Sequence, residues 1–308
     1  MAHSIKEKLQ NHMHTTGLSI QKVADSMGVS RPKLSSYLND KTQERNMSVK
    51  EIEKQVSDWL ARDEQRRASL AIPIVETKTT RNIDTICSTT HANNAISVVY
   101  GAAGTGKSTA LARYAKENTG VYLIEVDQSF SLTVLASEIC RVIGINPTGT
   151  NAILTKRIQE KLQNMDALLI FDECDYLSTR TLEWIRRVIH DKSQCGVILA
   201  GLQRLEFELK NQKNAHDQLV SRVLYWAHIT PPENEDLLLI VKSVWRDIDE
   251  PLQDLLVSSA RGSFRVLRNI MSITSLIARK VDSLLPKKQH IEGAIKGVYG
   301  TLETREVA

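Results

Sequence analysis

Apolar residues recur along the chain in two alternating patterns, short continuous runs and helical spacing. Five apolar runs predict strands at residues 95–100, 121–126, 167–173, 196–201 and 223–229. The segments between them predict helices at residues 109–115, 132–140 and 151–162, and a further helix from Ser178 onward. Apolar runs that alternate with helices favour an α/β core, in which helices cover both sides of a parallel sheet.

The first sixty or so residues show helical spacing only. Ser19 predicts the N-cap of one helix and Ser30 the N-cap of the next, with Gly28 at the turn between them. This order is the helix-turn-helix pattern, and residues 21–30 resemble the repressor/Cro-like group closely. A third amphipathic stretch completes a small helical core, with apolar positions at Val49, Ile52, Val56, Trp59 and Leu60.

The second helix of this pattern predicts a surface that contacts DNA. Its outward positions carry side-chain types that contact phosphates and base edges, namely Arg31, Lys33, Ser35 and Ser36. The alternative is a bundle of three or four helices used for protein contacts. We expect DNA contact, and backbone binding more than sequence readout, because the helix is only modestly basic.

Composition shifts divide the chain into four parts. A charged and then threonine-rich stretch around Pro73 predicts a linker, and residues 83–90 predict a short helix that leads into the α/β core. Behind Pro231 and Pro232 the pattern is entirely helical, with helices predicted at residues 235–247, 251–260, 264–280 and 289–302. The predicted domains are a helix-turn-helix domain at residues 1–62, a linker at 63–82, the core at 83–230 and a helical C-terminal domain at 231–308.

The composition is that of an ordinary globular protein, with 308 residues, 42% hydrophobic and 25% charged. No apolar run approaches the roughly 20 residues of a membrane span, so no membrane partner is expected. The N-terminus lacks the shape of a secretory signal, which predicts a cytoplasmic protein. The four cysteines form no CxxC pair, and reduced core positions are the simplest interpretation. A net charge of +4 is compatible with nucleic acid but decides nothing.

Residues 101–108 read GAAGTGKS and fit the phosphate-binding pattern G-x-x-x-x-G-K-[ST] at every fixed position. The predicted strand in front and the predicted helix behind supply the context that this motif requires. Its glycines let the backbone N–H groups surround a phosphate, and the helix N-terminus adds donors. Lys107 would reach the β- and γ-phosphates, and the Ser108 hydroxyl would ligate Mg²⁺. The motif therefore predicts a nucleoside triphosphate site, against the alternative of a glycine-rich turn.

Two acids end the predicted strand at residues 167–173, at the sheet edge where ligands of such sheets bind. Asp172 would hold the water shell of Mg²⁺, and Glu173 would act as general base on the attacking water. The alternative is a pair of helix-capping acids, but the upstream phosphate loop favours catalysis. The residues predicted to hold the nucleotide are Gly101, Gly104, Thr105, Gly106, Lys107, Ser108, Thr109 and Asp172.

A phosphate loop, an Asp-Glu strand end and later arginines resemble the AAA+ ATPases. The resemblance implies that Lys107 and Glu173 are catalytic. It also implies that Arg222 is an arginine finger for a neighbouring subunit and that Arg265 is a second sensor at the start of a lid helix. The family places a polar sensor after the strand at residues 196–201, whereas this chain has Leu202 there. Either Gln203 serves instead or hydrolysis is slow.

The order of all four parts resembles the transposition B proteins of Mu-like phages over nearly the whole chain. Supporting stretches are residues 37–41 (YLNDK), 101–108, 169–175 (LIFDECD), 221–222 and 265–269 (RVLRN). The resemblance implies ATP and Mg²⁺ as cofactors, and largely non-specific binding of double-stranded DNA by an ATP-dependent helical filament. It also implies delivery of target DNA to a transposase, stimulation of strand transfer, and release by hydrolysis.

Three basic residues on segments that flank the Asp172 strand are candidates for contact between filament and DNA, namely Lys156, Arg157 and Arg180. The C-terminal helices carry further basic residues, which predict either a contact surface or a solvated face. Two other functions remain open from the sequence. One is a transcription regulator in which the ATPase is a ligand switch, and the other is an AAA+ loader of a replicative helicase.

Overall fold

The computed structural model describes residues 4–39, 48–67, 70–211, 217–283 and 285–300. Asp40 and Lys41 of the YLNDK stretch lie outside these ranges, as do the last residues of the helix predicted to reach residue 302. The chain divides into two compact units, Met1–Leu70 and Ala71–Ala308.

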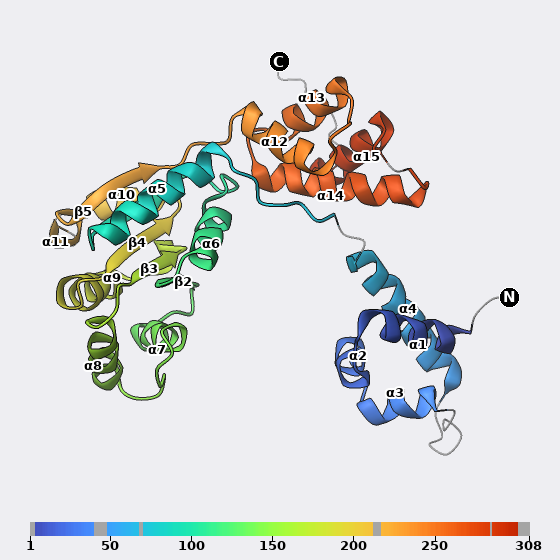
Figure 1. The fold of residues 1–308 in the computed structure, drawn as a ribbon, viewed down its shortest axis with the longest axis horizontal. Helices are drawn as coiled ribbons and strands as arrows, with labels where there is room; N and C mark the ends of the chain where they lie inside the picture. The colour runs from blue at the N-terminus through green and yellow to red at the C-terminus, as the bar shows by residue number, and fades with distance from the viewer. Residues whose placement is uncertain (1–3, 40–47, 68–69, 212–216, 284, 301–308) are drawn as a thin grey trace. The chain divides into compact units, whose positions relative to one another are not determined.

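The first unit is a cluster of helices around its own apolar core (Figure 1, blue). Its described helices are α1 Ile5–Thr16, α2 Ile20–Met27, α3 Arg31–Leu38 and α4 Val49–Arg67. The hydroxyl oxygens of Ser19 and Ser30 accept the backbone N–H of Lys22 and Lys33, as expected of N-caps. Gly28 ends α2 in the left-handed conformation, which a residue without a β-carbon adopts at little cost.

The second unit contains a parallel sheet of five strands in the order β2-β3-β4-β1-β5. The strands are β1 Ile96–Tyr100, β2 Val121–Glu125, β3 Leu168–Asp172, β4 Gly196–Gly201 and β5 Val223–His228. The prediction of a parallel sheet with helices is confirmed. Because β1 and β3 both pair with β4, the phosphate loop after β1 and the acids after β3 meet at one edge of the sheet.

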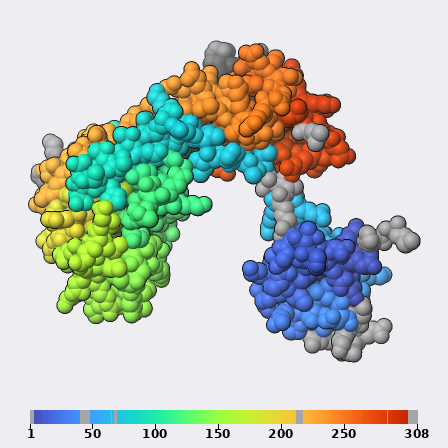
Figure 2. Space-filling view, viewed as in Figure 1, coloured from blue at the N-terminus to red at the C-terminus, as the bar shows by residue number. Residues whose placement is uncertain are grey.

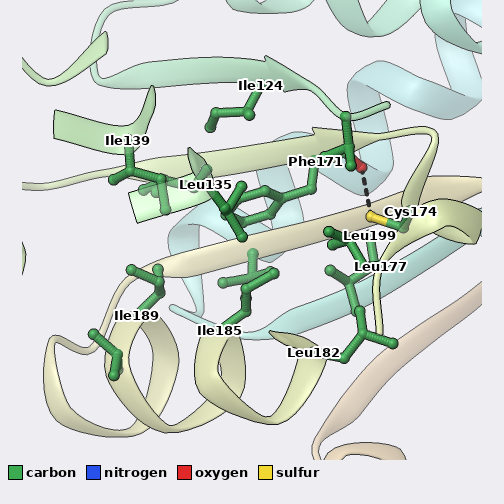
Figure 3. Packing of buried hydrophobic residues seen from close by; sticks show 14 of the residues in the cluster. Ile124, Leu135, Ile139, Phe171, Cys174, Leu177, Leu182, Ile185, Ile189 and Leu199 are labelled. Carbon is green, nitrogen blue, oxygen red and sulfur yellow. Dashed lines mark hydrogen bonds between the residues drawn. The ribbon is translucent and has the colours of Figure 1, made fainter. Parts of the chain in front are cut away.

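Helices cover both faces of this sheet, because successive side chains of a strand point to opposite faces. In β3, Leu169 and Phe171 face one core and Leu168 and Ile170 face the other. Helices α5 Lys78–Ala92 and α6 Lys107–Glu117 pack on the Ile170 face. The other face is covered by α7 Leu132–Val142, α8 Asn151–Leu162, α9 Thr179–Ile185, a π-helix η3 at Arg186–Lys192, and α10 Gln203–Asn211. Figure 3 shows Phe171 in the middle of the apolar core that these helices form with this face of the sheet.

The linker predicted at residues 63–82 is shorter in the structure. Helix α4 continues to Arg67, and α5 already begins at Lys78. The threonine-rich run that suggested a linker instead caps α5: the Thr77 hydroxyl accepts the backbone N–H of Thr80, whose side chain accepts the N–H of Thr77. The described residues between these helices, 70–77, belong to no helix or strand.

Helices make up the rest of the second unit. A single turn, α11 Asp217–Val220, precedes β5. After β5 come α12 Asn234–Val244, α13 Glu250–Ser259, α14 Phe264–Lys280 and α15 Lys288–Tyr299 (Figure 1, orange to red). No helix among the described residues is long and apolar enough to cross a membrane.

All four cysteines are buried and free of disulfide bonds. Burial raises the pKa of the Cys87 thiol to about 12 and that of Cys195 to about 11. Cys174 donates to the carbonyl of Phe171 at 3.1 Å (Figure 3). These thiols therefore serve as small core residues.

Candidate nucleotide site

The glycine-rich loop joins β1 to α6 and lies against the start of α14. Gly104 and Gly106 have φ angles of +84° and +89°, which side-chain-bearing residues rarely adopt. A β-carbon on Gly104 would lie 2.3 Å from the Ser263 hydroxyl, and one on Gly106 would lie 3.0 Å from the Phe264 ring. The backbone N–H of Phe264 donates to the carbonyl of Gly104 at 3.0 Å. The loop is thus packed closely against the start of α14 and hydrogen-bonded to it.

Lys107 lies at the start of α6 with only 7% of its surface exposed. Its ammonium donates to the carbonyls of Gly101 and Ala102, both at 2.9 Å, and to the Thr105 hydroxyl at 3.3 Å. Among the described residues no carboxylate lies within ion-pair distance of it. Burial lowers the pKa of Lys107, and the nearby carboxylates of Asp172 and Asp175 oppose this lowering. A buried ammonium held only by neutral oxygens is suited to an anionic ligand.

The two acids behind β3 have different environments. Asp172 is 3% exposed and accepts the backbone N–H of Glu173 at 2.9 Å. Glu173 is exposed and has a φ angle of +60°. Both residues line the same cavity as Lys107. One acid is therefore held rigidly beside the loop, and the other is free to meet water.

This cavity has a volume of about 520 Å³ and brings together most of the residues that the sequence predicted. Those that line it are Gly104, Thr105, Gly106, Lys107, Ser108, Thr109, Asp172, Glu173 and Arg265. Gly101 does not line the cavity; it is buried, and its carbonyl accepts from the Lys107 ammonium.

The first turns of α14 supply the cationic wall of the cavity. Ser263 caps the helix, and Arg265 and Arg268, one turn apart, both line the cavity. The sequence predicted a role at the nucleotide for Arg265, whereas it grouped Arg268 with the general basic surface of the C-terminal helices. The helical spacing from Arg265 to Arg268 is the signal that could have connected them.

The segment after β4 differs from the expectation for this position. Leu202 is exposed and lines the cavity, and its backbone N–H donates to the Asp175 carboxylate at 2.8 Å. Gln203 does not line the cavity. Arg204 lines it instead, and its Nε donates to Asp175 at 3.3 Å while its guanidinium lies 5.4 Å from the centre of the Tyr176 ring. The polar residue closest to the predicted sensor position that faces the cavity is therefore Arg204.

A second, apolar cavity of about 60 Å³ adjoins the loop, and Gly106, Thr109, Phe264 and Arg268 line both cavities. The rest of its wall includes the extended residues before α5, namely Ile72, Pro73, Ile74 and Val75, together with Ile240 of α12, Ala110 of α6 and the threonines at positions 77, 79 and 80. Figure 2 shows this extended segment running along the C-terminal helices. The sequence predicted this segment as linker, and its side chains stay partly or fully exposed, with Ile74 52% exposed.

Arg222 does not line either cavity. It lies between α11 and β5, with 38% of its side chain exposed. Its Nε donates to the Asp191 carboxylate at 2.8 Å, and its Nη1 donates to the carbonyl of Gln218 at 2.8 Å. Within one chain this arginine is thus anchored away from the phosphate loop.

The predicted DNA contacts of the first unit lie on α3. Arg31 is exposed, whereas Lys33 and Ser35 are half-buried. The prediction that Ser36 points outward is wrong, because it is 6% exposed. Leu34, Tyr37 and Leu38 are buried as well, so the second half of α3 is enclosed over more than one helix face.

The predicted DNA contacts of the second unit lie on α8 and α9. Lys156 is exposed and 3.7 Å from Glu160, and Arg180 is exposed. Arg157 is half-buried and donates to the carbonyls of Asn146 and Thr148 at 3.3 Å and 2.7 Å. Part of its hydrogen-bonding capacity therefore stabilises the loop before α8.

The fold and the cavity are those of a P-loop ATPase of the AAA type, and a family model described as an AAA domain matches residues 90–209. Among solved structures, the ORC1 protein of Aeropyrum pernix in complex with DNA aligns with a TM-score of 0.53 and 19% identity, over 74% of this chain and 67% of that one. The ADP form of the Aeropyrum pernix ORC2 protein aligns with a TM-score of 0.60 and 16% identity, over 75% and 72%. At these identities the likeness concerns the fold. The chain therefore contains an AAA-type ATPase domain.

The chain is also similar over most of its length to two curated transposition proteins. One is the Mu-like prophage FluMu DNA transposition protein B of Haemophilus influenzae, 26% identical over 84% of this chain and 92% of that protein. The other is the ATP-dependent target DNA activator B of Escherichia phage Mu, 25% identical over 89% of this chain and 88% of that protein. The resemblance to the B proteins of Mu-like transposition is therefore confirmed.

Proposed function

We propose that this ATPase assembles on target DNA when it holds ATP, delivers that DNA to a transposase and stimulates strand transfer. The observation that carries the proposal is one cavity that gathers the phosphate loop, Asp172, Glu173 and the α14 arginines, in a chain similar to a protein named ATP-dependent target DNA activator B. Hydrolysis would release the protein from DNA.

The two adjoining cavities support ATP as the nucleotide. The loop N–H groups and Lys107 would hold the β- and γ-phosphates, and the smaller apolar cavity beside Gly106 adjoins this phosphate site. Ser108 and Asp172 line the same cavity and offer a hydroxyl and a carboxylate, which are oxygen ligands of the kind that Mg²⁺ prefers. When bound there, Mg²⁺ would neutralise part of the phosphate charge.

Glu173 and the arginines would have different roles in catalysis. Glu173 would accept a proton from the attacking water, since its side chain is exposed at the cavity while Asp172 is engaged by a backbone N–H. Arg265 would stabilise negative charge on the γ-phosphate from the lid side. Arg222 would complete the site of a neighbouring subunit, because it lies away from its own cavity and is partly exposed.

DNA binding and closure of the nucleotide site would belong to different domains. The helix-turn-helix domain, residues 1–62, would bind DNA through α3, and the C-terminal domain, residues 231–308, would act as the lid of the core at residues 83–230. Contacts between an assembled filament and the DNA backbone would come from Lys156, Arg180 and the remaining donors of Arg157. Many weak phosphate contacts become strong binding once subunits assemble, so ATP would control DNA affinity through assembly in the cytoplasm of a bacterial host.

Binding to random-sequence duplex DNA with ATP, with ADP and without nucleotide tests this proposal. Binding should be tight only with ATP, and electron microscopy should then show filaments. The Lys107→Ala variant should lose the ATP dependence, and Arg222→Ala should bind ATP but lose DNA-stimulated hydrolysis. Tight binding to one operator sequence regardless of ATP would instead indicate a transcription regulator. Retention of a helicase and not of a transposase on the immobilised protein would indicate a loader.

A further inference from the structure

Arg186 is a buried cation outside the nucleotide cavity, and only 3% of its surface is exposed. A buried guanidinium is costly unless its donors are fully paired. Its Nε and Nη2 contact the Glu183 carboxylate at 3.0 Å and 2.9 Å, its Nη1 contacts Asp191, and its Nη2 also donates to the Gln218 side chain at 2.8 Å. The pairing is therefore extensive and specific.

The two partners outside its own helical turn are the same residues that hold Arg222. Asp191 accepts Arg186 with Oδ2 and Arg222 with Oδ1. Gln218 accepts Arg186 with its side-chain oxygen and Arg222 with its backbone carbonyl. Each anchor of Arg222 is thus itself fixed by Arg186.

The π-helix η3 makes this arrangement possible. Arg186 and Asp191 are five residues apart, which in an α-helix would place them about 140° apart around the axis. In a π-helix, residues five apart lie one turn above each other, so the pair faces the same side. A strand-covering helix with regular α geometry would turn Asp191 away from one of the two arginines.

We propose that Arg186 is the positioning residue of Arg222, holding its guanidinium in one orientation before a second copy of the chain arrives. Two of the three guanidinium nitrogens of Arg222 are used by these anchors, and Nη2 forms no hydrogen bond or ion pair with the described residues. That nitrogen is presented to the neighbouring subunit. Fixing the side chain in advance removes the entropy cost of ordering it during assembly. This inference rests on the proposed role of Arg222 in the neighbour's site.

The test compares Arg186→Met, Arg186→Lys, Asp191→Ala and Arg222→Ala in the full chain, with Arg187→Ala as matched control. Arg187 is the exposed neighbour of Arg186 on the same π-helix. The measurements are ATP affinity without DNA, thermal unfolding, and ATP hydrolysis with random duplex DNA. Asp191→Ala keeps the test valid if Arg186→Met does not fold, because the Asp191 side chain is 28% exposed.

Positioning predicts that Arg186→Met and Asp191→Ala lower the DNA-stimulated kcat by about tenfold or more, while ATP affinity stays that of wild type. Arg186→Lys should recover part of the rate, and Arg187→Ala should match wild type. Combined with Arg222→Ala, loss of Arg186 should cause no further decrease, because it acts through that residue. A purely structural role would instead lower both rate and ATP affinity, and the effects of Arg186→Met and Arg222→Ala would multiply.

Two results would overturn the inference in distinguishable ways. Wild-type stimulated hydrolysis by both Arg186→Met and Asp191→Ala, when Arg222→Ala is inactive, removes the positioning role and leaves the arginine finger intact. Wild-type stimulated hydrolysis by Arg222→Ala removes the finger itself, and with it the role of Arg186.

Discussion

Glu173 has a left-handed backbone conformation that residues other than glycine adopt at a cost of about 1–3 kcal/mol. Both backbone polar groups of Glu173 are hydrogen-bonded: its N–H donates to the Asp172 carboxylate, and its carbonyl accepts the N–H of Tyr176. Strain of this kind persists where the surroundings determine the conformation and concentrates at functional sites. Here it brings two adjacent side chains to one cavity in different environments, one buried and one exposed.

Glu173→Gln should bind ATP with wild-type affinity and lower the hydrolysis rate by about 10²-fold or more, because an amide cannot accept the proton of water. Isothermal titration and phosphate release measure the two quantities. The exposed Glu208 on α10 provides the matched Glu→Gln control. Hydrolysis at the wild-type rate by Glu173→Gln would assign the general base to another group.

Arg204→Ala should weaken ATP binding about tenfold or more and leave ADP binding nearly unchanged. The reason is the position of Arg204 in the cavity. Arg204 binds Asp175, and Asp175 also acts electrostatically on Lys107, so Arg204 lies toward the phosphate end of the cavity. Separate titrations with ATP and ADP measure the ratio. Gln203→Ala, one residue away and outside the cavity, should change neither affinity. An equal loss for both nucleotides would place Arg204 away from the terminal phosphate.

At the scale of elements, the site depends on the contact between the phosphate loop and the start of α14. Phe264 donates to Gly104 through the backbone, and Ser263 lies where a β-carbon on Gly104 would be. The N-terminus of α14 is therefore held at the loop, which places Arg265 and Arg268 over the cavity. The lid is coupled to the loop through backbone atoms, so the coupling does not depend on a single side chain.

Gly104→Ala should lower the free energy of unfolding by about 1 kcal/mol or more, because of its positive φ, and should also weaken ATP binding. The second effect follows from the displacement of α14 by the new β-carbon. Adding Ser263→Ala to Gly104→Ala removes the 2.3 Å contact and should restore part of the ATP affinity. Gly144→Ala is the control, since Gly144 also has a positive φ but a β-carbon there would have no atom within 4 Å. ATP affinity equal to wild type in Gly104→Ala would exclude this coupling.

At the scale of the whole molecule, the nucleotide cavities are built entirely within the second compact unit. Each unit has its own apolar core, and among the described residues the buried core of the first unit extends from Leu9 to Leu60. Nucleotide binding and the helix-turn-helix are therefore separable in principle.

A fragment of residues 71–308 should fold and bind ATP with the affinity of the full chain. Its affinity for random duplex DNA should fall, because the phosphate contacts proposed for α3 are lost. Calorimetric titration measures the first property, and DNA binding at several salt concentrations measures the second. A loss of ATP affinity in the fragment would show that the first unit contributes to the nucleotide site.

The sequence by itself determined the five strands, the caps at Ser19 and Ser30 and the residues of the phosphate loop. Short apolar runs and capping side chains act through local geometry, so their signals lie within a few residues. The loop and the Asp-Glu strand end could be joined from sequence because parallel strands place their carboxyl ends at one edge. The fold class and most of the cavity wall followed from these features.

Only the tertiary structure decided which side chains from distant segments meet. It buried Ser36, placed the extended residues 72–75 beside the loop, and brought Arg204 rather than Gln203 to the cavity. It also linked Arg186 to Arg222 through a π-helix, which the spacing of apolar residues in the sequence does not predict. Each of these outcomes depends on helix rotation and on packing between elements, which are set by the whole core and not by neighbouring residues.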